Sequence, residues 1–275
     1  GLTRASVWKP DCMTPQHSLR PGLLRRILKK PAALVSLVLL LSVLLAAVFL
    51  PFLLKADPHL TSSETFLSPC TAHLFGTDLN GRDLLARTLE GARISLLVGF
   101  TGASVSLVIG TSVGLLAGYV GGRLDAILMR LVDVLYAVPR LILILIAGFL
   151  IDPWLQRHLA DVQGGRWIGY SKIAILILAL GCIEWLTMAR IVRGQVLSLK
   201  TLPFVDAARV LGQSHSSILL KHLLPNLTGV VVVYLTLTVP AVVLDESFLS
   251  FLGLGVQAPQ ASWGTRSEER RVGKE

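Results

Sequence analysis

The sequence predicts an all-α membrane protein: a polytopic bundle of transmembrane helices, with a helix–turn–helix in its longest cytoplasmic loop. The 275 residues are 53% hydrophobic and only 16% charged, whereas a soluble domain has about 25% charged residues. The apolar residues also fall in long blocks, and the mean hydropathy is +0.67. These values exclude a disordered chain, a coiled coil and an ordinary cytosolic enzyme.

Five segments are long and apolar enough to cross a bilayer, whose hydrocarbon core of about 30 Å needs roughly 20 helical residues. They cover about 32–54, 94–119, 131–151, 172–188 and 228–251. The first is longer than the apolar region of a signal peptide, so we interpret it as an uncleaved anchor. Pro139 is expected to kink the third.

The placement of Lys and Arg predicts the orientation, because cytoplasmic loops carry an excess of them. Residues 189–227 hold five such residues and one acid, whereas residues 55–93 hold four and five acids. We therefore predict that the N-terminus and residues 189–227 lie in the cytoplasm and that residues 55–93 lie outside. This topology explains much of the net charge of +9, and no nucleic-acid partner is indicated.

The second span has a small residue at every fourth position. These residues are Gly102, Ser106, Gly110, Gly114 and Gly118. Residues four apart share one face of a helix, and a small face lets helices approach closely in lipid. We favour a tight contact with a neighbouring helix or a partner subunit, and the alternative is a flexible helix with incidental glycines.

The long cytoplasmic loop has the pattern of two short helices. Its alanine-rich residues 204–211 favour a helix, which Gly212 can end in a left-handed conformation at little cost. Ser214 or Ser216 could cap a second helix over residues 218–223. A proline at position 225 would limit the continuation of that helix.

The loop carries Asp206, Ala207, Ala208, Gly212, His222, Leu224 and Pro225 at a distinctive spacing. This spacing resembles the E-A-A-x3-G-x9-I-x-L-P loop of permease subunits in ATP-binding cassette importers, with Asp206 in place of Glu and His222 in place of Ile. Residues 73–93, 121–139 and 246–264 resemble the peptide and nickel branch of that family. The similarity is closest to the second permease subunit of dipeptide and oligopeptide importers.

The resemblance implies a transport subunit and not an enzyme. The subunit would form part of a pathway for small peptides or related solutes in the bacterial plasma (inner) membrane. Its implied partners are a homologous second permease, two ATPase subunits and an extracytoplasmic solute-binding protein. The ATPase subunits would bind ATP, because this chain has no phosphate-binding loop motif, and no cofactor is expected. The cytoplasmic loop would place a short helix in a groove of an ATPase subunit.

The same comparison divides the chain into three parts. We expect a basic cytoplasmic segment over residues 1–31, a transmembrane permease domain over 32–264 with its coupling loop at 189–227, and a polar tail over 265–275. The family has six spans, and a polar tail outside opposes the positive-inside rule. We therefore expect the tail to be foreign sequence in place of a last helix.

Three carboxylates, Glu184, Asp245 and Glu246, lie at or near the expected membrane depth, where a charge costs a few kcal/mol. They could form a proton relay in a secondary transporter, line or gate a permease pore, or pair with an arginine such as Arg190. An intramembrane enzyme is a further alternative, but it needs a nucleophile and base at one depth, and no histidine lies in a predicted span. The dispersed histidines and cysteines predict no metal site.

Overall fold

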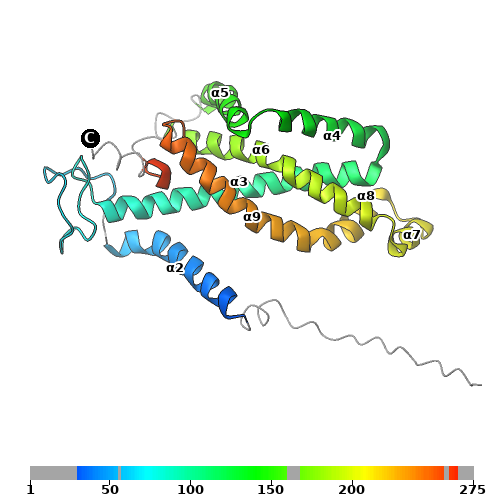
Figure 1. The fold of residues 1–275 in the computed structure, drawn as a ribbon, viewed down its shortest axis with the longest axis horizontal. Coiled ribbons are helices and arrows are strands. Elements are labelled where there is room, and N and C mark those ends of the chain that lie inside the picture. The colour runs from blue at the N-terminus through cyan, green and yellow to red at the C-terminus, as the bar shows by residue number, and fades with distance from the viewer. Residues whose placement is uncertain (1–29, 55–56, 160–167, 257–259, 266–275) are drawn as a thin grey trace, which may run out of the picture. The chain divides into compact units, whose positions relative to one another are not determined.

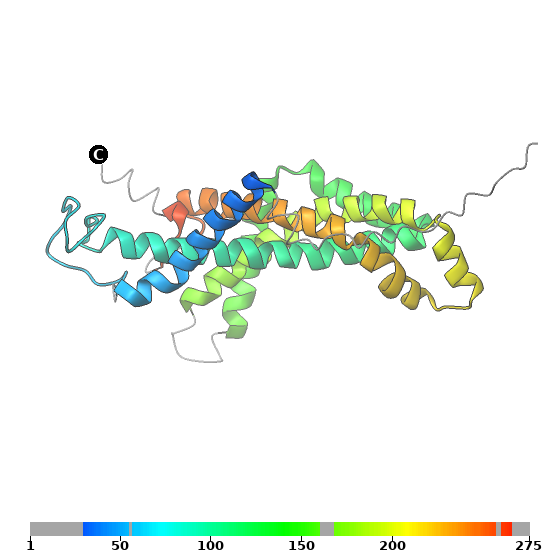
Figure 2. The same ribbon diagram turned by 90° about the horizontal axis from the view of Figure 1, so that it is seen from below.

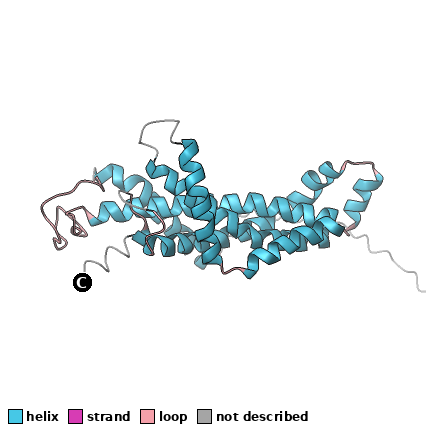
Figure 3. Ribbon diagram, turned by 90° about the horizontal axis from the view of Figure 1, so that it is seen from above, coloured by secondary structure: helices cyan, strands magenta, loops and turns pink. Residues whose placement is uncertain are grey.

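A computed structural model describes residues 30–54, 57–159, 168–256 and 260–265. Within these residues the protein is helical and has no β-strand (Figure 3). The chain divides into two compact units, Gly1–Val43 and Leu44–Glu275. Helix α2 (Pro31–Leu54) begins in the first unit and ends in the second, and the other described helices belong to the second unit.

Three long helices form the centre of the second unit. Its elements are α3 (Leu84–Val120), α4 (Gly122–Ala137), α5 (Arg140–Leu159), α6 (Ile168–Leu199), α7 (Pro203–Val210), α8 (His215–Ser217), the π-helix η1 (Ile218–Leu223) and α9 (Leu224–Phe251). Helices α3, α6 and α9 lie side by side (Figures 1 and 2). The loop over residues 57–83 and helix α7 lie at opposite ends of α3 (Figure 1).

Four helical segments in the described part of the chain are long and apolar enough to cross a membrane. They are Pro31–Pro51, Leu84–Val120, Ile173–Leu199 and His215–Phe251. Helix α3 has 37 residues and is therefore about 55 Å long at 1.5 Å per residue, well above the roughly 30 Å of a bilayer core. These segments confirm the predicted all-α polytopic fold.

The expected span over residues 131–151 is interrupted, not merely kinked. Proline disfavours a helical conformation at the residue before it, and Val138 is extended, with φ −88° and ψ 133°. Helix α4 therefore ends at Ala137, and α5 starts with a charged residue, Arg140. Neither α4 nor α5 is among the four candidate spans.

The small-residue face of α3 packs mainly against α6 of the same chain. A Cβ atom at Gly114 would lie 2.6 Å from the Ala189 carbonyl oxygen, and one at Gly118 would lie 2.8 Å from the Val196 Cβ. Such distances leave no room for a side chain. Gly110 meets the same helix, Gly102 faces α9 as well, and Ser106 is buried.

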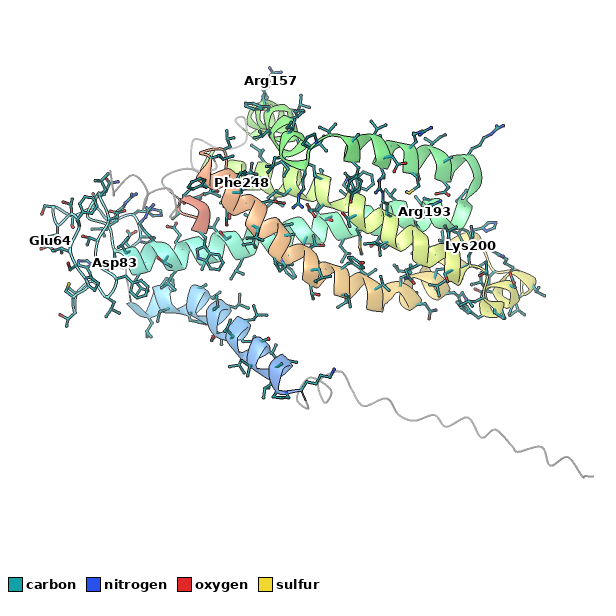
Figure 4. The ribbon with its side chains drawn as sticks, in the orientation of Figure 1. Glu64, Asp83, Arg157, Arg193, Lys200 and Phe248 are labelled. Carbon is teal, nitrogen blue, oxygen red and sulfur yellow. The ribbon has the colours of Figure 1, made fainter. Side chains whose placement is uncertain are left out.

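Hydrogen bonds fold the loop over residues 57–83 around Asp78. Its Oδ1 accepts from the backbone N–H groups of Asn80 (2.8 Å) and Arg82 (2.9 Å), and its Oδ2 accepts from the Arg82 Nε (2.8 Å). Burial alone would raise the pKa of Asp78, but these bonds outweigh it and hold the pKa below its usual range. The side chain of Asp83 then caps α3 by accepting from the Ala86 N–H at 2.9 Å. Figure 4 shows Glu64 in this loop and Asp83 where it joins α3.

Candidate functional site

Helix α7 is a short helix with defined ends. Proline is favoured in the first turn of a helix, because its missing N–H has no partner there anyway, and α7 begins at Pro203. Its other end is a Schellman motif. Gly212 has a φ of +72° and donates to the Arg209 carbonyl (2.9 Å), while Gln213 donates to the Ala208 carbonyl (3.1 Å).

The turn after α7 is fixed to the next helical segment by side chains. Ser214 caps α8 by accepting from the Ser217 N–H at 3.3 Å. The Gln213 Oε1 accepts from the His222 Nε2 at 2.8 Å and from the Ser217 hydroxyl at 3.3 Å. His222, which replaces the Ile of the wider motif, therefore ties η1 back to the turn.

The second predicted helix does not stop at Pro225. Residues 218–223 form the π-helix η1, which runs directly into α9, and Pro225 lies in the first turn of α9. Proline is tolerated there, so Leu224 and Pro225 begin a helix that continues to Phe251. The expected stop at Pro225 is wrong for this reason.

The two faces of α7 differ sharply. Val205 and Ala208 are buried in an apolar cluster with residues of α6, η1 and α9. On the outside, Asp206 pairs with Arg209 at 2.9 Å, and both side chains are exposed. Val210 is 88% exposed at the end of the helix, and the adjoining Leu211 is 78% exposed. Val210 and Leu211 are adjacent, and contiguous exposed apolar side chains mark interaction sites.

Arg140, whose side chain is partly exposed, joins three helices. Its guanidinium lies 2.8 Å from the Glu184 carboxylate of α6 and also pairs with Asp245 of α9. The arginine that pairs with these two carboxylates is Arg140 and not Arg190, the example suggested from the sequence, which pairs with Asp133 of α4 at 2.7 Å. A charged residue directly after Pro139 was the signal in the sequence that could have identified Arg140.

The remaining carboxylate, Glu246, is fully buried. One of its oxygens accepts from the Ser95 hydroxyl of α3 (2.8 Å), and the other accepts from the Ser250 hydroxyl (2.7 Å). Each serine also accepts a backbone N–H from beyond α9: Ser95 from Trp263 at 3.3 Å and Ser250 from Val256 at 3.1 Å. Glu246 thus connects α3, α9 and the segment that follows α9.

A further ion pair joins α4 to the part of α6 that leads to α7. The Arg193 guanidinium donates two hydrogen bonds to the Asp125 carboxylate, at 2.5 and 2.6 Å. These bonds, opposed in part by burial, lower the pKa of Asp125. Arg193 lies on the part of α6 that leads to α7, and Lys200 directly follows the end of α6 (Figure 4). Among the described residues, no group of three potential metal ligands was found.

The long apolar helices, the interhelical ion pairs and the short capped helix together define a multi-pass helical membrane protein. The chain belongs to the family of binding-protein-dependent transport system inner membrane components, whose model matches residues 110–271. A second family model, for the N-terminal transmembrane domain of oligopeptide transport permease C, matches residues 22–69. The resemblance predicted from the sequence is confirmed.

Several characterised relatives cover most of the chain. The oligopeptide transport system permease protein OppC of Haemophilus influenzae is 42% identical over 245 residues, which are 87% of this chain and 72% of the relative. The dipeptide transport system permease protein DppC of Bacillus subtilis is 42% identical over 259 residues, or 93% of this chain and 74% of the relative. OppC of the same organism is 38% identical over 253 residues, or 92% and 77%. These relatives are transport permease proteins, not enzymes.

Proposed function

We propose that this chain is a permease subunit of an ATP-driven importer. It forms part of the translocation pathway for small peptides or related solutes in the bacterial inner membrane, with its N-terminus in the cytoplasm. It works with a homologous second permease, two ATPase subunits and an extracytoplasmic solute-binding protein. The names and coverage of its relatives support this assignment.

The observation that carries the proposal is the exposed apolar end of α7. Val210 and Leu211 extend from a helix whose other face is buried and whose end is fixed by the Gly212 turn. A short helix with a rigid base and apolar residues at its tip suits insertion into a groove of another protein. For α7 of this chain, the groove is that of a partner ATPase subunit, which binds and hydrolyses ATP.

We further propose that the carboxylates inside the bundle are gating or structural groups and not a proton relay. Glu184 and Asp245 both pair with the Arg140 guanidinium. The Glu246 carboxylate accepts hydrogen bonds from two serine hydroxyls. Opening a pathway beside α5, α6 and α9 would require the Arg140 contacts to separate. A proton-coupled carrier that uses these groups is therefore the weaker alternative.

Co-purification with the ATPase subunits of the importer tests the proposal. Val210→Asp and Leu211→Asp should each weaken the association by about 30-fold, as expected when an apolar interface residue worth roughly 2 kcal/mol is lost. Leu79→Asp is the matched control, because Leu79 is 56% exposed in the loop at the opposite end of α3. Association that survives both α7 substitutions would contradict the proposed contact.

A further inference from the structure

Two hydrogen bonds, one on either side of α7, attach the cytoplasmic loop to the end of α3. Before α7, the Lys200 ammonium donates to the Gly118 carbonyl oxygen at 2.8 Å. After α7, the Tyr119 hydroxyl lies 2.7 Å from the His215 Nδ1. Gly118 and Tyr119 are neighbours in the last turn of α3, so both attachments reach the same place.

The contact between Tyr119 and His215 is more than a single hydrogen bond. Their ring centres lie 5.7 Å apart with an interplanar angle of 66°, which is an edge-to-face arrangement. Tyr119 also packs against the apolar cluster that contains Val205 and Ala208, the buried residues of α7. The inner face of α7 and the end of α3 therefore share one packed core.

The end of α3 is itself fixed to α6. Gly114 and Gly118 bring the two backbones so close that a Cβ atom at either position would meet α6 at under 3 Å. Packed interiors transmit displacement because they contain few voids. A movement delivered to Tyr119 would thus displace α3 and α6 together.

The chain also connects the loop to α9 directly. This connection runs through η1, a six-residue π-helix, and π-helical turns are among the places where helices kink. Leu220 and Lys221 in this turn are exposed. The covalent route to α9 therefore has a point where the helix can bend, and Leu227 and Val231 of α9 pack in the same apolar cluster as α7.

We propose that Tyr119 and His215 are positioning residues that carry the displacement of α7 to the α3–α6 pair. This inference rests on the proposed function, because it takes α7 as the helix that an ATPase subunit moves. It adds a route of transmission, which runs from α7 through the contact between Tyr119 and His215 to α3 and α6. Lys200 supports the same contact from the other side of α7.

The test uses the complete importer reconstituted in lipid vesicles, with solute uptake and ATP hydrolysis measured on the same sample. Tyr119→Phe removes only the hydroxyl and should lower uptake per ATP about fivefold, the scale expected for one lost hydrogen bond. ATPase association should stay unchanged. The control is Tyr234→Phe, the same substitution in the same apolar cluster, which should leave uptake per ATP unchanged.

The exchange of both residues separates positioning from simple structural support. The double variant Tyr119→His with His215→Tyr can form the pair again and should recover uptake per ATP to near the wild-type value. Normal uptake per ATP in Tyr119→Phe, or an equal loss in Tyr234→Phe, would overturn the inference. Val210→Asp distinguishes a failure of the inference from a failure of the proposed function. If Val210→Asp weakens ATPase association while Tyr119→Phe has no effect on uptake per ATP, the proposed function stands and the inference fails. If Val210→Asp also has no effect, the proposed function itself fails.

Discussion

The guanidinium of Arg140, at the first residue of α5, lies 2.8 Å from the carboxylate of Glu184 on α6. Asp245 of α9 pairs with the same guanidinium, so one cation serves two carboxylates from two other helices. Taking the cation away would leave two largely buried carboxylates without a compensating charge, which costs more than the pair itself contributes. The cluster begins directly after the helix break at Pro139, and its ion pairs connect α5 to α6 and α9.

Arg140→Leu should destabilise the protein by roughly 2 kcal/mol, less than the 3–5 kcal/mol of a fully buried pair, because the Arg140 side chain is 44% exposed. Adding Glu184→Gln and Asp245→Asn should restore part of the loss. Thermal unfolding in detergent measures both effects. Arg209→Leu is the control, since its exposed pair with Asp206 is worth under about 1 kcal/mol. An equal effect of the two arginine substitutions would contradict this account.

Gly114→Ala should destabilise the α3–α6 contact by about 1–3 kcal/mol, the usual cost of overpacking a core. The new methyl group would lie 2.6 Å from the Ala189 carbonyl oxygen. Gly194→Ala on α6 is the matched control, because nothing lies within 4 Å of its added Cβ. The two unfolding temperatures should differ clearly, and identical values would show that the helices are not in close contact.

The stability of the loop over residues 57–83 should depend on pH through Asp78. Its pKa is lower in the folded loop than in the unfolded chain, so its stabilisation is complete above the ordinary carboxyl pKa of about 4 and is lost as the pH falls through the folded value. Amide exchange of residues 57–83, corrected for intrinsic rates, should show protection falling in that range. Asp78→Asn should have weaker protection at neutral pH and little further loss in acid. Identical profiles for the two proteins would remove Asp78 from this role.

The predicted orientation of the chain in the membrane can be tested by labelling single cysteines in a protein whose natural cysteines are replaced. A membrane-impermeant thiol reagent added outside intact cells should label Ser63→Cys and leave Ser216→Cys unlabelled. Both positions are exposed, so access depends on the side of the membrane. The opposite labelling pattern would place α7 outside, where no ATPase subunit could reach it.

Local chemistry made most of the fold predictable. The apolar blocks predicted the long helices, and the loop sequence predicted both α7 and its end, because Gly212 is suited to the left-handed turn that it adopts. Ser214 was one of two expected caps and is the one used. Each of these features depends on residues close together in the sequence.

Contacts between distant segments were not predictable in the same way. The pairing of Arg140 with Glu184 and Asp245 depends on how α5 is placed after the break at Pro139, which no local pattern specifies. The bond between Tyr119 and His215 joins residues 96 positions apart. The role of Pro225 was misjudged because a proline in the first turn of a helix and a proline that ends one look alike in the sequence.

The central claim, that α7 contacts an ATPase subunit, is tested most directly by a photocrosslinker placed at Val210 in the assembled importer. Irradiation should join the permease to an ATPase subunit, identified by the mass of the product and by the crosslinked peptide. The same crosslinker at Leu79 should give no such product. A Val210 product that contains only lipid or another permease chain, with the ATPase subunits present in the complex, would contradict the claim.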